Sequence, residues 1–155
     1  MDSVEIMSPV GSYESLIAAI QGGADSVYFG VGKLNMRSRS SQNFSLDDLD
    51  KIVDIARQHN VKTYLTLNTV IFDADMAEMQ QTVDRAKAAG ITAIIASDMS
   101  VIEYAHERGL EVHISTQSNI TNLKSVKFFS QYADVVVTAD RKSTRLNSSH
   151  GIIWF

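Results

Sequence analysis

The chain has 155 residues, a formal net charge of −4 and no cysteine. This length is sufficient for one domain with a sizeable core, and the lack of cysteine excludes disulfides, thiolate metal sites and a cysteine nucleophile. The acidic balance gives no overall basic surface for nucleic acid, although one basic groove can lie in an acidic protein. No apolar run reaches the roughly 20 residues of a membrane helix and no secretory signal opens the chain, so we expect a cytoplasmic protein with no membrane partner.

Strands and helices are expected to alternate along the chain. Short apolar or alternating runs predict strands over residues 4–7, 26–29, 61–68, 93–96, 111–116 and 135–138. Helical spacing of apolar residues follows each of the first five strands, with Ser12 and Ser45 as N-caps of the first two helices and Asp75 starting the third. This repeated alternation implies a parallel sheet covered by helices.

Two architectures fit that pattern, an open doubly wound sheet and a β/α barrel. Gly30 and Gly32 supply part of a dinucleotide-binding fingerprint, but Asn35 stands where its third glycine would be. The barrel is favoured by polar side chains on the strand face opposite the apolar one, which a doubly wound sheet would bury: Tyr28, Tyr64, Thr66, His113 and Ser115. We therefore predict an α/β fold, an incomplete TIM-type (β/α) barrel that comprises strands one to six of eight and leaves open edges at strands one and six.

The last sixteen residues differ in character from the rest. Residues 140–150 have no apolar period and resemble the translation of a sequencing adapter, and residues 151–155 form an isolated apolar end. We predict that 1–139 is the N-terminal part of a barrel and that 140–155 is a non-native tail. The alternative is a basic surface loop before a seventh strand. A truncated chain of this kind is expected to be inactive by itself.

Polar residues gather where the predicted strands end, which is where parallel α/β proteins bind ligands. Gln117 and Asn119 follow the fifth strand and Asn68 ends the third, and their amides can both donate and accept hydrogen bonds to a substrate. The alternative is that they cap the loop or the next helix. Arg37 and Arg39 follow the second strand and could clamp a carboxylate or a phosphate, or could lie in a solvated loop.

One acid–base pair can be placed inside the predicted barrel. His113 points inward if the alternation holds, and Glu5 can face the same lumen, so the two could shift each other's pKa and act as catalytic residues. A polar layer that only fixes the barrel register is the alternative. The histidines show no metal-ligand spacing, and neither a zinc-protease motif nor a serine nucleophile elbow is present. No metal site is therefore expected in this chain.

Five sequence blocks, in order, resemble the N-terminal part of the peptidase U32 family, also called collagenase-like proteases. The blocks are EIMSPVG at 5–11, ADSVYFG at 24–30, NFS at 43–45, TLNT at 66–69 and HISTQSNITN at 113–122. The resemblance covers residues 4–139 and implies a barrel fold.

The resemblance implies two classes of activity for the intact parent. Some members are described as proteases, and others resemble hydroxylases that modify tRNA or rRNA bases, or a quinone ring, without molecular oxygen. Prephenate as oxygen donor and an iron–sulfur cluster on cysteines of the C-terminal half are implied for the hydroxylases, whereas this chain should hold no cofactor. We favour the RNA base hydroxylase over a collagenase-like protease, with RNA or peptide as the substrate. The native oligomeric state stays open.

Overall fold

The computed structural model describes residues 4–36, 43–139 and 152–154. Its sheet has seven strands in sequential order, of which the first six are parallel. These strands are β1 (Met7–Pro9), β2 (Ser26–Phe29), β3 (Lys62–Leu67), β4 (Ala93–Ala96), β5 (Glu111–Ile114) and β6 (Val135–Val137). The predicted incomplete β/α barrel with strands one to six is thereby confirmed.

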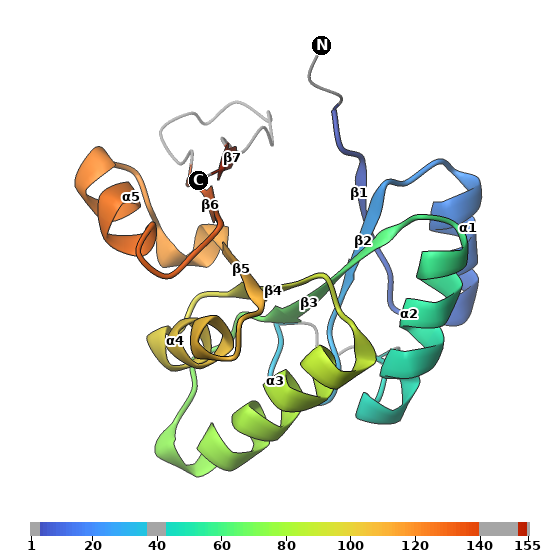
Figure 1. Cartoon of the computed structure of the whole chain (residues 1–155), viewed down its shortest axis with the longest axis horizontal. Helices are drawn as coiled ribbons and strands as arrows, with labels where there is room; N and C mark the ends of the chain where they lie inside the picture. The colour runs from blue at the N-terminus through green and yellow to red at the C-terminus, as the bar shows by residue number, and fades with distance from the viewer. Residues whose placement is uncertain (1–3, 37–42, 140–151, 155) are drawn as a thin grey trace.

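The helices all lie on the convex side of the curved sheet, so the concave side faces a partly open lumen (Figure 1). They are α1 (Tyr13–Gln21), α2 (Leu49–Gln58), α3 (Met76–Ala89), α4 (Met99–Glu107) and α5 (Leu123–Phe129), with short 3₁₀ turns η1 (Leu46–Asp48), η2 (Asp73–Asp75) and η3 (Thr116–Ser118). Ser12 caps α1 as predicted, because its side chain accepts from the backbone N–H of Ser15. Ser45 precedes η1 rather than α2, so a 3₁₀ turn separates the predicted cap from its helix.

The core lies between the convex face of the sheet and the helices. The outward strand residues there are almost fully buried, among them Phe29, Leu65, Leu67, Ile94, Val112 and Ile114. The concave face carries the polar set, with Tyr28 paired to Tyr64 and His113 paired to Val135 in the ladder. A two-residue period places these two sets on opposite faces.

The first strand begins later than the pattern predicted, at Met7 instead of residue 4. It is an edge strand that pairs only with β2, and Pro9 is tolerated there because an edge strand needs backbone donors on one side only. The ladder continues past the proline, since the N–H of Val10 donates to the carbonyl of Tyr28. The fifth strand ends at Ile114 rather than at residue 116, because residues Thr116–Ser118 turn into η3.

The sequence predicted an open edge at strand six, and this is wrong for the described residues. A further strand, β7 (Ile152–Trp154), pairs antiparallel with β6, with Val136 opposite Ile153. The edge strands of the described sheet are therefore β1 and β7. The assignment of 140–155 as a non-native tail stays a prediction, and residues 140–151 and 155 lie outside the described residues.

Candidate functional site

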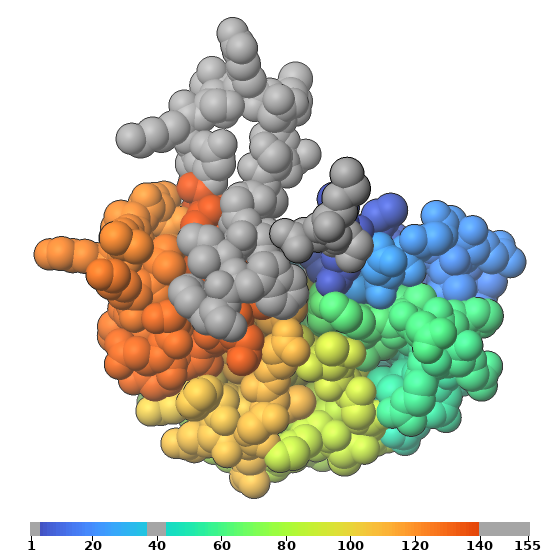
Figure 2. Space-filling view, turned by 45° about the horizontal axis from the view of Figure 1, so that its top comes forward, coloured from blue at the N-terminus to red at the C-terminus, as the bar shows by residue number. Residues whose placement is uncertain are grey.

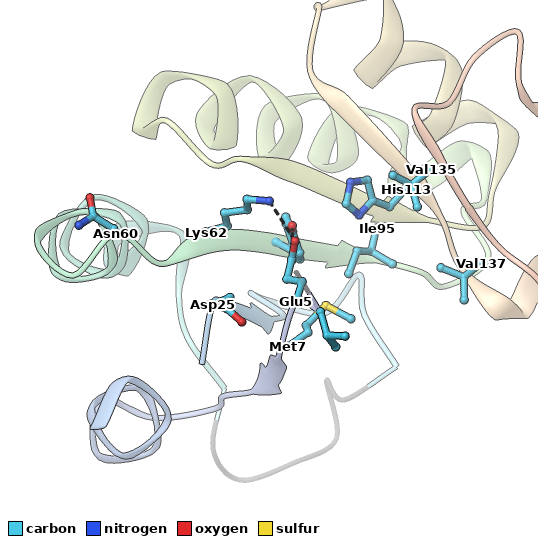
Figure 3. A pocket seen from close by; sticks show the side chains of 11 residues that line it. Glu5, Met7, Asp25, Asn60, Lys62, Ile95, His113, Val135 and Val137 are labelled. Atoms are coloured by element: carbon cyan, nitrogen blue, oxygen red, sulfur yellow. Dashed lines mark hydrogen bonds and ion pairs between the residues drawn. The ribbon is translucent and has the colours of Figure 1, made fainter. Parts of the chain in front are cut away.

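A cavity of about 760 Å³ occupies the concave face of the sheet (Figure 3). One wall is apolar and is formed by Ile95, Val135 and Val137. The opposite wall is polar and comes from the first three strands and the segments before them: Glu5, Asp25, Asn60, Lys62 and Tyr64. His113 of β5 lies between the two walls.

Glu5 is the centre of a hydrogen-bond network in this cavity. Its Oε1 accepts from the Tyr64 hydroxyl at 2.7 Å, and its Oε2 lies 2.9 Å from the Lys62 ammonium. Both partners belong to β3, whereas Glu5 precedes β1, so the bonds cross the intervening strand β2. The backbone N–H of Ile6 also donates to the Asp25 carboxylate at 2.7 Å. The network therefore ties the segment before the edge strand to the body of the sheet.

The environment of Glu5 favours its charged form. Partial burial by itself would raise the pKa of Glu5, but the hydrogen bonds from Tyr64 and Lys62 and the positive charge of Lys62 outweigh burial, so the pKa lies below its ordinary value of 4.5. The pKa of Tyr64 is raised, first by burial and then by its hydrogen bond to the Glu5 carboxylate. Tyr64 therefore remains a neutral donor and Glu5 a charged acceptor at neutral pH.

This arrangement predicts a specific pH dependence for Glu5→Gln. A carboxylate whose pKa is depressed in the folded state stabilises it fully above the unfolded-state pKa, and that stabilisation is lost as the pH falls through the folded pKa. The variant should therefore be less stable than the wild type between pH 6 and 8, and the difference should shrink below about pH 4. Urea unfolding across this range measures it. A difference that stays constant down to pH 2 would contradict the assignment.

Glu103→Gln is a matched control for that experiment. It makes the same change in net charge at an exposed position on the outer helix α4. Its unfolding curves should show whether a general charge effect accounts for the result.

His113 is buried, and its Nε2 lies 2.7 Å from Oε1 of Glu111. Its ring centroid is 4.8 Å from that of Tyr64. The sequence-predicted pair His113 and Glu5 therefore shares one cavity, with Tyr64 in contact with both. Glu5 stands at the amino ends of the strands, where barrel residues commonly serve stability. The catalytic role of the two residues stays a prediction.

The carboxyl ends of β3, β4 and β5 form a polar rim. The half-buried Asn68 follows β3 and accepts from the N–H of Met36 at 3.3 Å. Asp98 follows β4 and caps α4 through Ser100, and it also accepts from the N–H of Ile71. Although burial would raise the pKa of Asp98, these hydrogen bonds lower it below the ordinary value. This residue therefore supports the loops as a charged cap.

Gln117 and Asn119 form the exposed part of the rim at the end of β5. Asn119 adopts a left-handed conformation, with φ of 53° and ψ of 39°, and its amide donates to the carbonyl of Gln117 at 3.2 Å. The N–H of Gln117 donates to the hydroxyl of Ser115, so η3 is held at both ends while the Gln117 side chain faces solvent. The structure brings these two predicted residues together. Arg37 and Arg39 lie outside the described residues.

Sequence reasoning missed three members of the cavity network, Lys62, Tyr64 as a partner of Glu5, and Glu111. Lys62 and Glu111 each lie two residues from another inward-facing position, so the alternation that placed His113 inside the barrel also places their side chains there, but it does not reveal the bonds to Glu5. The described residues contain no group of three His, Asp or Glu side chains that could hold a metal ion. In that part of the chain, no helix is long and apolar enough to cross a membrane.

A curved parallel sheet with helices outside, a polar lumen and an amide-lined rim defines a half-barrel of the β/α class. A sequence profile of peptidase family U32 matches residues 11–141. The chain belongs to this family.

Relatives within the family carry names for two activities. A protein named collagenase from Porphyromonas gingivalis strain W83 is 58% identical over 139 residues, covering 90% of this chain and 34% of the relative. A tRNA hydroxylation protein P1 from Bacillus subtilis strain 168 is 30% identical, covering 90% of this chain and 33% of the relative. The chain thus spans about a third of the length of these curated relatives.

A solved structure agrees on the fold. The U32 peptidase Mk0906 superposes with a TM-score of 0.72 at 14% identity, covering 88% of this chain and 58% of that one. At this identity, the similarity is evidence for the barrel fold alone and says nothing about activity.

Proposed function

We propose that this chain is part of a hydroxylase that modifies tRNA or rRNA bases without molecular oxygen, and that it supplies a rim that positions the base. The support from relatives is the tRNA hydroxylation protein P1, which aligns over 90% of this chain. The observation that carries the proposal is the pair of exposed amides at the end of β5.

Amide side chains suit the recognition of a base. Gln117 and Asn119 can each donate and accept hydrogen bonds, as the edge of an unpaired nucleobase requires. Asn68 lies at the end of β3 on the same rim. All three groups are uncharged, so they can bind a neutral base without a large desolvation cost. A rim of this kind would position the base while the chemistry occurs elsewhere.

The cofactors follow from the family resemblance and belong to the proposal for the whole protein. An iron–sulfur cluster needs cysteine thiolates, and this chain has none, so its residues do not fit a cluster. Prephenate, the proposed oxygen donor, carries two carboxylates. Arg37 and Arg39 are proposed to bind those carboxylates or an RNA phosphate, because guanidinium groups pair with both.

Peptide hydrolysis is the second candidate function. It is favoured by the 58% identity to the relative named collagenase. The two candidates predict different products, a hydroxylated base or a cleaved peptide, and can be separated directly.

The test is mass-spectrometric mapping of tRNA and rRNA in a strain that lacks the full gene. We expect one hydroxylated base to disappear and to return on complementation. Complementation with Gln117→Ala or Asn119→Gly should restore less than about a tenth of the modification; glycine is chosen at 119 because it tolerates the left-handed backbone. Gln81→Ala, an exposed amide on α3, is the control and should restore it fully. An unchanged RNA profile, with gelatin cleavage by the purified protein, would favour the protease instead.

A further inference from the structure

One face of α5 combines two lysines with an exposed aromatic side chain. We call it the α5 face, and it consists of Leu123, Lys124, Lys127 and Phe128 of the helix and of Gln131 just beyond it, all exposed. At 100° per residue the four positions within α5 fall on one side of the helix, while Val126 on the opposite side is buried against the core. Figure 2 shows α5, in orange, at one lateral edge of the molecule.

The charge of this face is opposite to that of the whole chain. Residues 123–131 contain two lysines and no aspartate or glutamate, in a protein with a net charge of −4. Neither Lys124 nor Lys127 forms an ion pair with a carboxylate of the described residues. Glu103 and Glu107 on the neighbouring helix α4 limit the basic region to α5 itself. Both ammonium groups are therefore available to an anionic partner.

A row of rings accompanies these lysines. The side chain of Phe128 is 49% exposed. Its ring centroid lies 6.1 Å from that of Tyr132, which in turn lies 6.0 Å from the ring of His106 on α4. The ring of Phe129, which packs against the core, meets the Phe128 ring edge-on at a centroid distance of 5.3 Å. The ring is thus held in place with its outer surface in water.

We propose that the α5 face binds single-stranded RNA, with Lys124 and Lys127 on phosphates and Phe128 stacked on a base. Lysines along the backbone and an exposed ring are the two elements by which proteins hold unpaired nucleic acid. The face also adjoins the rim, because Asn122 caps α5 three residues after Asn119. A single-stranded RNA bound along α5 would therefore lead towards Gln117 and Asn119. This inference rests on the proposed function for its choice of RNA.

The test is fluorescence anisotropy of a labelled single-stranded RNA of about 12 nucleotides with the 155-residue chain, from 20 to 200 mM salt. The double variant Lys124→Ala/Lys127→Ala should weaken binding at least tenfold at low salt. It should also reduce the slope of log K against log salt by about 1.4, because each single-strand phosphate contact contributes about 0.7. Phe128→Ala should weaken binding about tenfold and leave the slope unchanged.

The matched control is Lys51→Ala/Lys87→Ala, which removes the same charge from the exposed surfaces of α2 and α3. It should bind RNA as the wild type does. Circular dichroism melting shows whether each variant is folded. Equal weakening in the control, or an unchanged affinity in both α5 variants, would overturn the proposal.

The outcome is separable from that of the proposed function. Binding requires no hydroxylation, so RNA binding that depends on the α5 face supports the surface even if the RNA profile of the deletion strain is unchanged. Conversely, a full gene carrying the α5 substitutions that still restores modification overturns the surface and leaves the function intact. A chain that binds gelatin peptides through the α5 face and no RNA would also overturn it.

Discussion

Replacing Gly30 with alanine is expected to lower the free energy of unfolding by about 3 kcal/mol. An added Cβ at this position would lie 2.2 Å from Cγ of Asn35, far inside contact distance. Asn35 is only 1% exposed and cannot move cheaply, because its amide donates to the carbonyls of Val31 at 3.0 Å and Gly32 at 3.3 Å. Displacing it would leave buried polar atoms without partners. Urea unfolding at pH 7 measures the loss.

A double-mutant cycle with Asn35→Ala isolates the cause. If the clash with the Asn35 side chain accounts for the loss, Gly30→Ala should cost less than about 1 kcal/mol in the Asn35→Ala background. Gly23→Ala is a useful comparison, because nothing lies within 4 Å of its added Cβ and only its positive φ of 83° opposes alanine. It should cost about 1 kcal/mol. Equal costs of Gly30→Ala in both backgrounds would contradict the packing explanation.

The Gly30 site also explains why the glycine pattern was ambiguous in the sequence. Gly30 and Gly32 resemble part of a dinucleotide fingerprint, and Asn35 seemed to be a departure from it. In the structure Asn35 is the reason for Gly30, because its side chain fills the space that a Cβ would take. The glycine serves a close approach within the loop after β2. A sequence pattern can signal such an approach without telling whether the partner is a ligand or the protein itself.

The fold was predictable because local patterns agree with the global arrangement. Strand–helix alternation and the apolar face of α2, including Leu49, Ile52 and Ala56, follow directly from periodicity. The ends of β1 and β5 were less predictable, because an edge strand accepts Pro9 and a 3₁₀ turn competes with the strand after Ile114. Pairing of β6 with β7 depends on a contact across residues 138–151 that no local period reveals.

The site was predictable only at the level of faces and strand ends. Alternation placed His113 inside the lumen, the end of the fifth strand placed Gln117 and Asn119 on the rim, and the structure agrees with these positions. The sequence pattern could not show that Glu5 would reach across β2 to Tyr64 and Lys62. Glu5 is separated from Tyr64 by 59 positions in the sequence and from Lys62 by 57 positions, and the two contacts depend on the curvature of the sheet. Partners of this kind are set by tertiary geometry.

Tyr64→Phe is expected to destabilise the protein by about 2 kcal/mol, since a hydrogen bond to a charged group contributes more than a neutral one. Phenylalanine keeps the ring against His113 but removes the 2.7 Å bond to Glu5. The Glu5 carboxylate, whose side chain is 26% exposed, would then keep its ion pair with Lys62 but lose its shorter hydrogen bond, the one from Tyr64. Thermal and urea unfolding at pH 7 measure the loss.

The same variant distinguishes two roles for Glu5, a structural clasp that holds the edge strand β1 to the sheet or a reactive group. In a Glu5→Gln background, Tyr64→Phe should cost only about 1 kcal/mol, because the bond it removes is then neutral. Hydrogen exchange at the N–H groups of Ile6 and Val10 should accelerate in Tyr64→Phe, since those bonds hold the segment that Glu5 anchors. A clasp therefore predicts loosening of β1 together with lost stability. Unchanged exchange at both amides would show that Glu5 is not what holds the edge strand, and its place in the cavity would then require a chemical explanation.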